Sequence, residues 1–257
     1  MSRFFSPLEL ERTTMIRRIL LLCLLLVSVA LSPLHAAQSV LIGSGAGYKR
    51  PVAELAESFT KKTGIRVEQI YGHMAGILSQ AKQSGQVAVV FGDLSYLEKV
   101  DTVAFSGFLP VGEGRLVLAW PKGAAVQSPS DLADPRFARI ALPDAKAAIY
   151  GIAATEFLQR SGIEASVKSR IQMVATVPQV SAYLVSGEID AGFINLTEAL
   201  GIRERIGGYM EIDRALYSPI RIVGGVVKGF ESQEAVEALA TFLKSAEARE
   251  ILGKHGL

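Results

Sequence analysis

The chain has 257 residues, of which 49% are hydrophobic and 20% are charged, a composition typical of folded proteins and not of disordered ones. Its formal net charge is only +2, so it lacks the basic excess that would indicate a nucleic-acid partner. These values predict a globular protein of one or two domains.

The apolar residues concentrate near the N-terminus. Arg17 and Arg18 precede a nearly unbroken apolar run over residues 19–31, and a segment ending in Ala36 and Ala37 follows it. A basic start, a short apolar centre and a small-residue end are typical of a secretory signal peptide. The run is shorter than the about 20 residues that a membrane span needs. We therefore expect residues 1–37 to be a signal peptide that is removed on export.

Removal of this segment changes the net charge and the cysteine content of the chain. The whole chain has 27 basic and 25 acidic residues, and the segment holds four and two of them, so 23 of each remain and the net charge is zero. Cys23, the single cysteine of the sequence, also lies in the segment. The exported protein is therefore expected to contain no disulfide and to use no thiol chemistry.

Short β-rich runs alternate with amphipathic helical patterns along the remaining 220 residues, which predicts an α/β architecture with largely parallel sheets. Strands are expected at residues 40–42, 65–70, 87–91, 115–120, 139–142, 171–174 and 191–194, and another apolar run covers 220–227. Helices are expected from Pro51 to Gly64, at 75–83, 151–159 and 178–186, and twice near the C-terminus. Ser232 is the predicted N-cap of the first C-terminal helix.

The helix that begins near Pro51 has a regular pattern. Proline is tolerated in a first helical turn, and glycine commonly ends a helix, here at Gly64. Between them, apolar residues follow the i, i+3, i+4, i+7 spacing of one buried helix face: Val52, Leu55, Ala56 and Phe59.

Four strand–loop–helix junctions share a short loop of small residues, at 43–47, 72–75, 149–151 and 176–178. Free N–H groups and a partial positive charge mark the N-terminus of each helix. In open α/β sheets these loops gather at the carboxyl ends of the strands. The pattern predicts a site for an anion, held without a formal positive charge.

Residues that would indicate catalysis, metal binding or nucleotide binding are scarce. The sequence contains no G-x-S-x-G, P-loop, H-E-x-x-H or C-x-x-C motif, and only His73 and His255 remain beyond the expected signal peptide. Gly43, Gly45 and Gly47 imitate a dinucleotide fingerprint, but Tyr48 occupies the position of its third glycine. The four loops also lack carboxylates, so we expect no catalytic residue, no metal site and no cofactor.

Four segments resemble a known family in their order and spacing. They are 59–67, 114–118, 140–154 and 186–193, the last reading Ser-Gly-Glu-Ile-Asp-Ala-Gly-Phe. Over residues 40–257 the chain resembles the periplasmic molybdate-binding proteins of ABC transporters, which are type II solute-binding proteins. The resemblance implies a two-lobed fold with a ligand cleft between lobes that are each a mostly parallel sheet flanked by helices. It also implies lobe I at 38–117 and 222–257, lobe II at 118–221, and linkers near Val117–Leu118 and Arg221–Ile222.

The resemblance also implies a set of ligand-binding residues. Tyr150 falls on a tyrosine that binds the anion in one branch of the family, and Val177 falls on a residue that gives a backbone amide. Gly47 and Met74 stand where the family usually offers hydroxyl or amide side chains, and Asn195 stands where one branch has a second tyrosine. The full set of expected contacts is Ser44, Gly47, His73, Met74, Tyr150, Gly151, Val177 and Asn195.

These observations favour a monomeric periplasmic receptor that closes on a small tetrahedral oxyanion, molybdate or tungstate, and delivers it to an inner-membrane ABC permease. A second hypothesis keeps the fold and changes the ligand to an organic acid or a phosphorylated metabolite, because two hydroxyl donors are replaced by Gly47 and Met74. A third hypothesis is an exported protein outside transport, either an enzyme or an adhesin-like surface protein.

Overall fold

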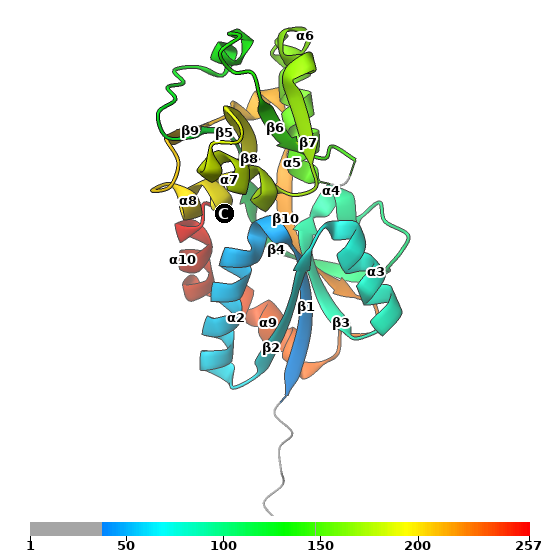
Figure 1. Cartoon of the computed structure of the whole chain (residues 1–257). Coiled ribbons are helices and arrows are strands. Elements are labelled where there is room, and N and C mark those ends of the chain that lie inside the picture. The colour runs from blue at the N-terminus through cyan, green and yellow to red at the C-terminus, as the bar shows by residue number, and fades with distance from the viewer. Residues whose placement is uncertain (1–37, 147) are drawn as a thin grey trace, which may run out of the picture. The chain divides into compact units, whose positions relative to one another are not determined.

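In the part of the chain that the structure describes, two five-stranded sheets form the framework of the fold (Figure 1). The computed structural model describes residues 38–146 and 148–257, and the predicted signal peptide at residues 1–37 lies outside them. None of the helices in this described part is long and apolar enough to span a membrane.

The first sheet has the strand order β2-β1-β3-β10-β4. Its members are β1 (Ser39–Gly45), β2 (Arg66–Gly72), β3 (Val87–Asp93), β4 (Phe105–Gly114) and β10 (Ile220–Val227). Strand β1 pairs in parallel with β2 and β3, whereas β10 pairs antiparallel with β3 and β4. All seven residues of β3 are buried, because helices cover both faces of this central strand.

Helices pack on both faces of the first sheet. On one face lie α2 (Lys49–Thr63), α9 (Glu234–Leu243) and α10 (Ala246–Lys254), where Phe59 and Phe242 meet edge to face. On the other face lie α3 (Met74–Ser84) and α4 (Leu94–Leu97). Val89 and Val90 belong to different apolar clusters, one on each face, as the alternation of side chains along a strand requires.

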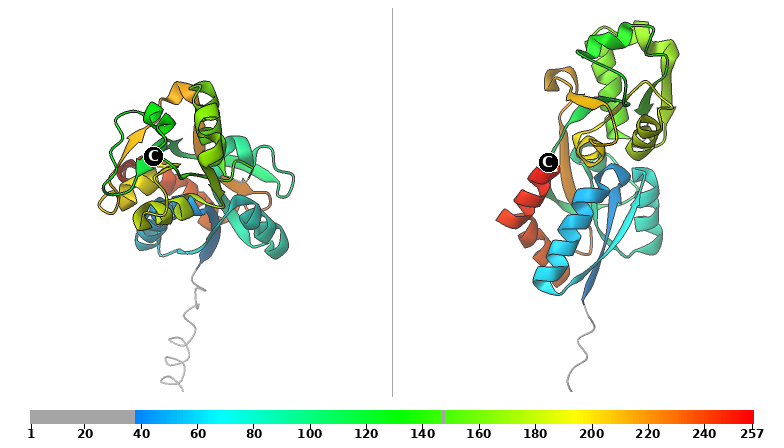
Figure 2. Two further views of the ribbon diagram at one scale, coloured as in Figure 1. Left: turned by 45° about the horizontal axis from the view of Figure 1, so that its top comes forward. Right: turned by 60° about the vertical axis from the view of Figure 1, so that its left-hand side comes forward.

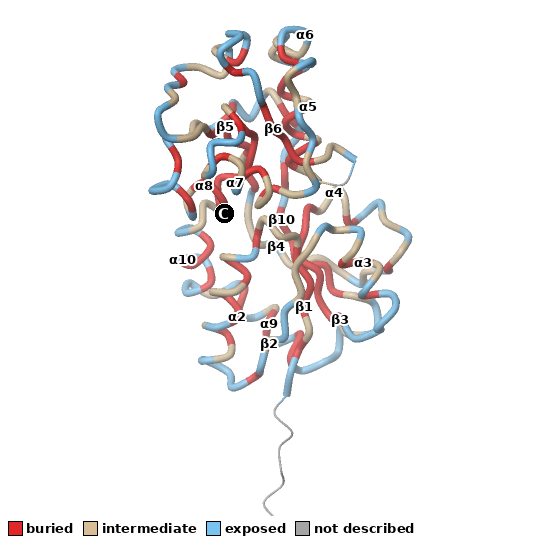
Figure 3. The backbone as a smooth tube through the Cα atoms, viewed as in Figure 1, coloured by how far each residue is buried: buried red, intermediate tan, exposed pale blue. Residues whose placement is uncertain are grey.

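The second sheet has the strand order β7-β6-β8-β5-β9. Its members are β5 (Leu116–Trp120), β6 (Ile140–Pro143), β7 (Ile171–Val174), β8 (Ala191–Asn195) and β9 (Gly208–Glu211). Strand β6 pairs in parallel with β7 and β8, and β5 pairs antiparallel with β8 and β9. The buried residues run through both sheets and the helices around them (Figure 3).

Helices flank the second sheet as well. They are α5 (Ile149–Arg160), α6 (Glu164–Val167), α7 (Val177–Ser186) and α8 (Leu196–Ile202). Phe193 of β8 packs against Phe157 of α5, and a Cβ at the neighbouring Gly192 would meet Val180 of α7. Adjacent strand residues point to opposite faces, so α5 and α7 cover the two faces of this sheet. Short 3-10 helices complete the fold: η1 (Ala46–Tyr48), η2 (Pro129–Ala133), η3 (Lys168–Arg170) and η4 (Arg214–Leu216).

Each sheet with its helices forms one lobe, called lobe I for the first sheet and lobe II for the second (Figure 2). The chain passes into lobe II between β4 and β5 and returns between β9 and β10. The predicted two-lobed α/β fold is confirmed. The sheets are mixed rather than mostly parallel, because the strands next to the two crossovers, β4, β5, β9 and β10, make antiparallel pairs.

Several local predictions differ from the structure. Helix α2 begins at Lys49, two residues before Pro51, and ends at Thr63, with Gly64 as its C-cap in the left-handed conformation at φ 75°. Gln233, not Ser232, is the N-cap of α9, and its side chain makes no capping hydrogen bond. Strands β4 and β9 were not expected from the sequence.

Candidate functional site

A small cavity of about 70 Å³ lies between residues of the two lobes. Lobe I contributes the loop after β1, the loop after β2 and the end of β3, and lobe II contributes the starts of α5 and α7. The residues that line the cavity are Gly45, Ala46, Gly47, Tyr48, Gly72, His73, Met74, Gly92, Asp93, Tyr96, Ala148, Ile149, Tyr150, Ala175, Thr176 and Val177. All four of the loops predicted to gather at one edge contribute to this lining.

The N-cap residues of four helices line the cavity: Tyr48 of α2, His73 of α3, Ala148 of α5 and Thr176 of α7. Thr176 accepts a hydrogen bond from the Gln179 amide at 3.3 Å, and Nδ1 of His73 accepts one from the Gly76 amide at 3.2 Å. Tyr48 and Ala148 provide no side-chain cap. The first amides of α5 are therefore available to a group in the cavity, and the helix dipoles favour a negative charge there.

Two tyrosine hydroxyls meet across the lobes. The hydroxyl of Tyr48, from η1 of lobe I, lies 2.7 Å from that of Tyr150, the second residue of α5 in lobe II. Both side chains are buried, and burial raises the pKa of each hydroxyl well above its ordinary value near 10. Both tyrosines therefore stay protonated at neutral pH and can donate hydrogen bonds.

Asp93 places a buried carboxylate at the edge of the cavity, at the N-cap of α4. Its Oδ1 accepts hydrogen bonds from the Tyr96 amide at 3.1 Å and from the Ser95 hydroxyl, and its Oδ2 accepts one from the Arg221 amide at 3.0 Å. These three donors hold the carboxylate within lobe I. Asp93 was not among the residues expected at the site, although its position at the end of a buried strand is a signal that could have identified it.

Five of the eight residues expected at the site line the cavity: Gly47, His73, Met74, Tyr150 and Val177. The Met74 side chain packs along lobe I, where its Cε would lie 3.0 Å from a Cβ at Gly92. Gly47 approaches lobe II so closely that a Cβ there would lie 3.2 Å from the Asn195 Nδ2 atom and 3.5 Å from the Val177 Cβ atom.

The other three lie next to the cavity and do not line it. Ser44 is fully buried, and its hydroxyl donates to the carbonyl of Gly45 at 3.2 Å. Gly151 lies against the backbone that enters α5, where a Cβ would come within 2.2 Å of the Pro143 oxygen. Asn195 accepts from the Glu198 amide at 3.0 Å as the N-cap of α8 and donates through Nδ2 to the Gly47 oxygen at 3.1 Å. Their roles toward a ligand stay predictions.

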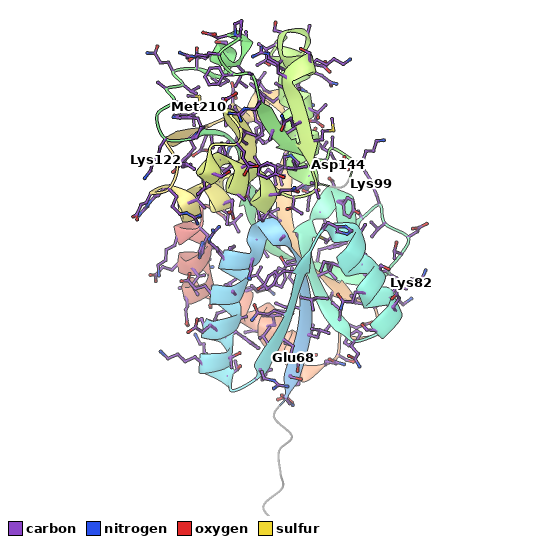
Figure 4. The ribbon with its side chains drawn as sticks, in the orientation of Figure 1. Glu68, Lys82, Lys99, Lys122, Asp144 and Met210 are labelled. Atoms are coloured by element: carbon purple, nitrogen blue, oxygen red, sulfur yellow. The ribbon has the colours of Figure 1, made fainter. Side chains whose placement is uncertain are left out.

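The lobes also contact each other beside the cavity, at the start of α8. Arg50 of α2 forms an ion pair with Glu198, whose side chain is only 9% exposed. The Thr197 hydroxyl donates to the His255 carbonyl at 2.9 Å. Figure 4 places Lys99, after α4 of lobe I, and Asp144, after β6 of lobe II, on the opposite side of the view, where the two lobes face each other. Within residues 38–146 and 148–257, no group of three His, Cys, Asp or Glu residues is placed to hold a metal ion.

Comparison with known proteins gives a consistent result. The chain is 28% identical over 228 residues to the molybdate-binding protein ModA of Azotobacter vinelandii, covering 86% of this chain and 90% of the relative. It is 26% identical over 225 residues to ModA of Rhodobacter capsulatus, covering 86% and 88% of the two chains. These relatives are named as binding proteins and not as enzymes.

Solved structures show the same fold. The periplasmic molybdate-binding protein of Azotobacter vinelandii superposes with a TM-score of 0.74 at 23% identity, covering 84% of this chain and 97% of that one. The model of the family described as bacterial extracellular solute-binding protein matches residues 40–257, which is nearly all of the described part. This chain therefore belongs to the bacterial extracellular solute-binding protein family.

Proposed function

We propose that this protein is a periplasmic receptor that binds a tetrahedral oxyanion, molybdate or tungstate, in the cavity between its lobes and delivers it to an inner-membrane ABC permease. The observation that carries the proposal is the meeting of four helix N-termini and two neutral tyrosine hydroxyls at one small cavity. The similarity to two molybdate-binding proteins supports the choice of ligand.

The residues that line the cavity are better suited to binding an anion than to catalysing a reaction. Backbone amides at the starts of α5 and α7 and the two hydroxyls are uncharged donors, so they would balance a dianion by hydrogen bonds and by the helix dipoles. The carboxylate of Asp93 is occupied by three donors of its own lobe, which leaves it poorly placed as a general base.

The size of the cavity favours a small ligand. Sites for drug-sized molecules typically enclose about 300–1,000 Å³, whereas this cavity encloses about 70 Å³. A tetrahedral oxyanion is much smaller than a sugar phosphate, and it has acceptor oxygens on every side to match donors from both lobes. This difference in size is our reason for preferring an oxyanion to an organic acid or a phosphorylated metabolite.

Binding would involve closure of the lobes. We propose that the lobes expected at residues 38–117 with 222–257 and at 118–221 move against each other, with bending near the crossovers between β4 and β5 and between β9 and β10. Leu116 and Val117 would move with lobe II, and Ile220 and Arg221 with lobe I, because they pair within those sheets. Residues 1–37 would direct export to the periplasm and be removed, and the mature protein would act as a monomer. The closed lobes would present the surface that the permease recognises.

A thermal-shift panel of molybdate, tungstate, sulfate, phosphate, citrate and a sugar phosphate tests the proposal. A ligand at about a thousand times its Kd stabilises the folded form by roughly 4 kcal/mol. Each kcal/mol raises Tm by about 2–4 °C in a chain of this size, so we expect a rise on the order of 10 °C. Molybdate and tungstate should each raise Tm by a similar amount, and sulfate, which is smaller, should have little effect on Tm.

Other outcomes would identify the alternatives. A response to citrate or the sugar phosphate alone would replace the oxyanion with an organic acid or a phosphorylated metabolite as the ligand class. No response to any member of the panel would contradict a receptor for these ligands and would favour an exported protein outside transport.

A further inference from the structure

The buried hydroxyls of Tyr48 and Tyr150 are hydrogen-bonded to each other, which the proposed anion site does not by itself require. Tyr150 is placed at the cavity by α5, but its hydroxyl points toward the crossover between the lobes, where a Cβ at Gly114 would come within 2.3 Å of it. The Tyr48 hydroxyl meets it there, 2.7 Å away, with the ring centroids 6.2 Å apart and the rings tilted by 51°.

The hydrogen bond between the hydroxyls leaves one proton unused. Each tyrosine hydroxyl has one proton to donate and lone pairs that accept. One of the two protons lies between the oxygens, so the pair as a unit retains a single O–H for a further acceptor, which is either the neighbouring Asn195 side chain or a ligand in the cavity. A hydroxyl that already takes part in a hydrogen bond is polarised by it and donates more strongly.

Tyr48 and its neighbour Gly47 form one contact surface toward lobe II. The Gly47 carbonyl accepts a hydrogen bond from Asn195 at 3.1 Å, and the tight packing of Gly47 against Val177 and Asn195 leaves no room for a hydroxyl-bearing side chain at position 47 without a shift. The side chain of the next residue, Tyr48, therefore brings the hydroxyl of this loop to the cavity and to Tyr150 at once.

We propose that Tyr48 is a positioning residue for anion binding: its hydroxyl fixes the direction of the Tyr150 hydroxyl, so that the remaining O–H of the pair donates a hydrogen bond to the ligand when the lobes close. This inference rests on the proposed function, because it assigns a role at the same cavity. Tyr48 then affects affinity only through Tyr150. The pair also connects the first loop of lobe I to the start of α5 in lobe II, so the donor is complete only in the closed arrangement.

The test is a double-mutant cycle measured by titration calorimetry with molybdate and tungstate, using Tyr48→Phe, Tyr150→Phe and the double variant. Phenylalanine keeps the packing of the ring and removes only the hydroxyl. We expect Tyr48→Phe to weaken binding about threefold to tenfold and Tyr150→Phe about tenfold to a hundredfold. The double variant should bind within twofold of Tyr150→Phe, because no hydroxyl then remains to be positioned.

Tyr183→Phe is the matched control, since its hydroxyl takes a hydrogen bond from Gln179 within α7 and does not line the cavity. It should leave the affinity unchanged. Denaturant unfolding of each variant without ligand shows whether a loss of affinity exceeds a general loss of stability.

Three results would overturn the inference. If the wild-type protein binds the anions and Tyr48→Phe binds them equally well, Tyr48 has no role at the site and the proposed function is unaffected. Effects that multiply in the double variant would show that Tyr48 acts independently of Tyr150. A wild-type protein that binds neither anion would contradict the proposed function, and the inference with it.

Discussion

The start of α5 allows folding stability and anion binding to be separated with one substitution. Ala148 occupies the N-cap of α5 with extended backbone angles, φ −133° and ψ 127°, and has no side-chain acceptor for the first amides of the helix. Aspartate at an N-cap accepts hydrogen bonds from these amides and stabilises a helix by about 0.5–2 kcal/mol relative to alanine. We therefore expect Ala148→Asp to raise Tm of the ligand-free protein by about 2–4 °C per kcal/mol gained.

The same substitution should abolish tight binding. The new carboxylate would occupy the amides that we assign to the anion and place a negative charge beside it. Two unit charges about 4 Å apart interact by about 4 kcal/mol at an effective dielectric constant near 20, and a dianion experiences more. An affinity loss of at least about a hundredfold is expected, equivalent to about 2.7 kcal/mol. Ala148→Asn, which caps without the charge, should lose less.

Gln233→Asp provides the matched control. Gln233 is also an N-cap without a side-chain capping bond, but it begins α9 of lobe I and does not line the cavity. It should leave the anion affinity within twofold of wild type. Calorimetric titration together with thermal unfolding measures both quantities for all the variants. A stabilised Ala148→Asp protein that keeps its affinity for molybdate would refute the assignment of the α5 amides to the ligand.

Three further predictions concern the contacts between the lobes. Gly47→Val should weaken binding at least tenfold and increase the radius of gyration in small-angle scattering with ligand present, because even a Cβ at this position would lie only 3.2 Å from Asn195 Nδ2. Unchanged scattering would contradict this. Arg50→Ala should lower the free energy of unfolding by about 1–3 kcal/mol, because it leaves the buried Glu198 carboxylate without its cation, and Glu198→Gln in the same chain should recover part of the loss in denaturant melts. Above about pH 10 the free energy of unfolding should fall, because the folded state keeps tyrosine protons that the unfolded chain releases. Burial raises the pKa of Tyr48 and of Tyr150 above the value in the unfolded chain, and it raises the pKa of Tyr71 to about 12. The fall should be shallower when Tyr48 and Tyr150 are both replaced by Phe, and equal slopes would contradict the assignment.

The central elements of both lobes could be predicted from the sequence because they have strong local signals. Strand β3 is a continuous apolar run, and α2 combines an apolar face with a glycine that ends the helix at Gly64. The edge strand β4 could not be predicted in this way. Half-exposed residues, two internal glycines and Pro110 interrupt its pattern, and proline is tolerated in a strand at the edge of a sheet.

The part of the site that consists of helix N-termini could be predicted from the sequence. Within each lobe the two loops lie together because parallel strands place their carboxyl ends at one edge of a sheet. The interlobe contacts depend on how two separately folded sheets meet, which no local pattern encodes. The hydrogen bond from Asn195 to the Gly47 oxygen and the pairing of Tyr48 with Tyr150 are contacts of this kind.

Anomalous scattering from a crystal of the protein grown with tungstate shows directly where the ligand binds. Tungsten can be located independently of the surrounding density. We expect one strong anomalous peak in the cavity, between the Tyr150 hydroxyl, the first amides of α5 and the Val177 amide at the start of α7. A cavity without a peak, or a tungsten atom bound elsewhere on the protein, would contradict it.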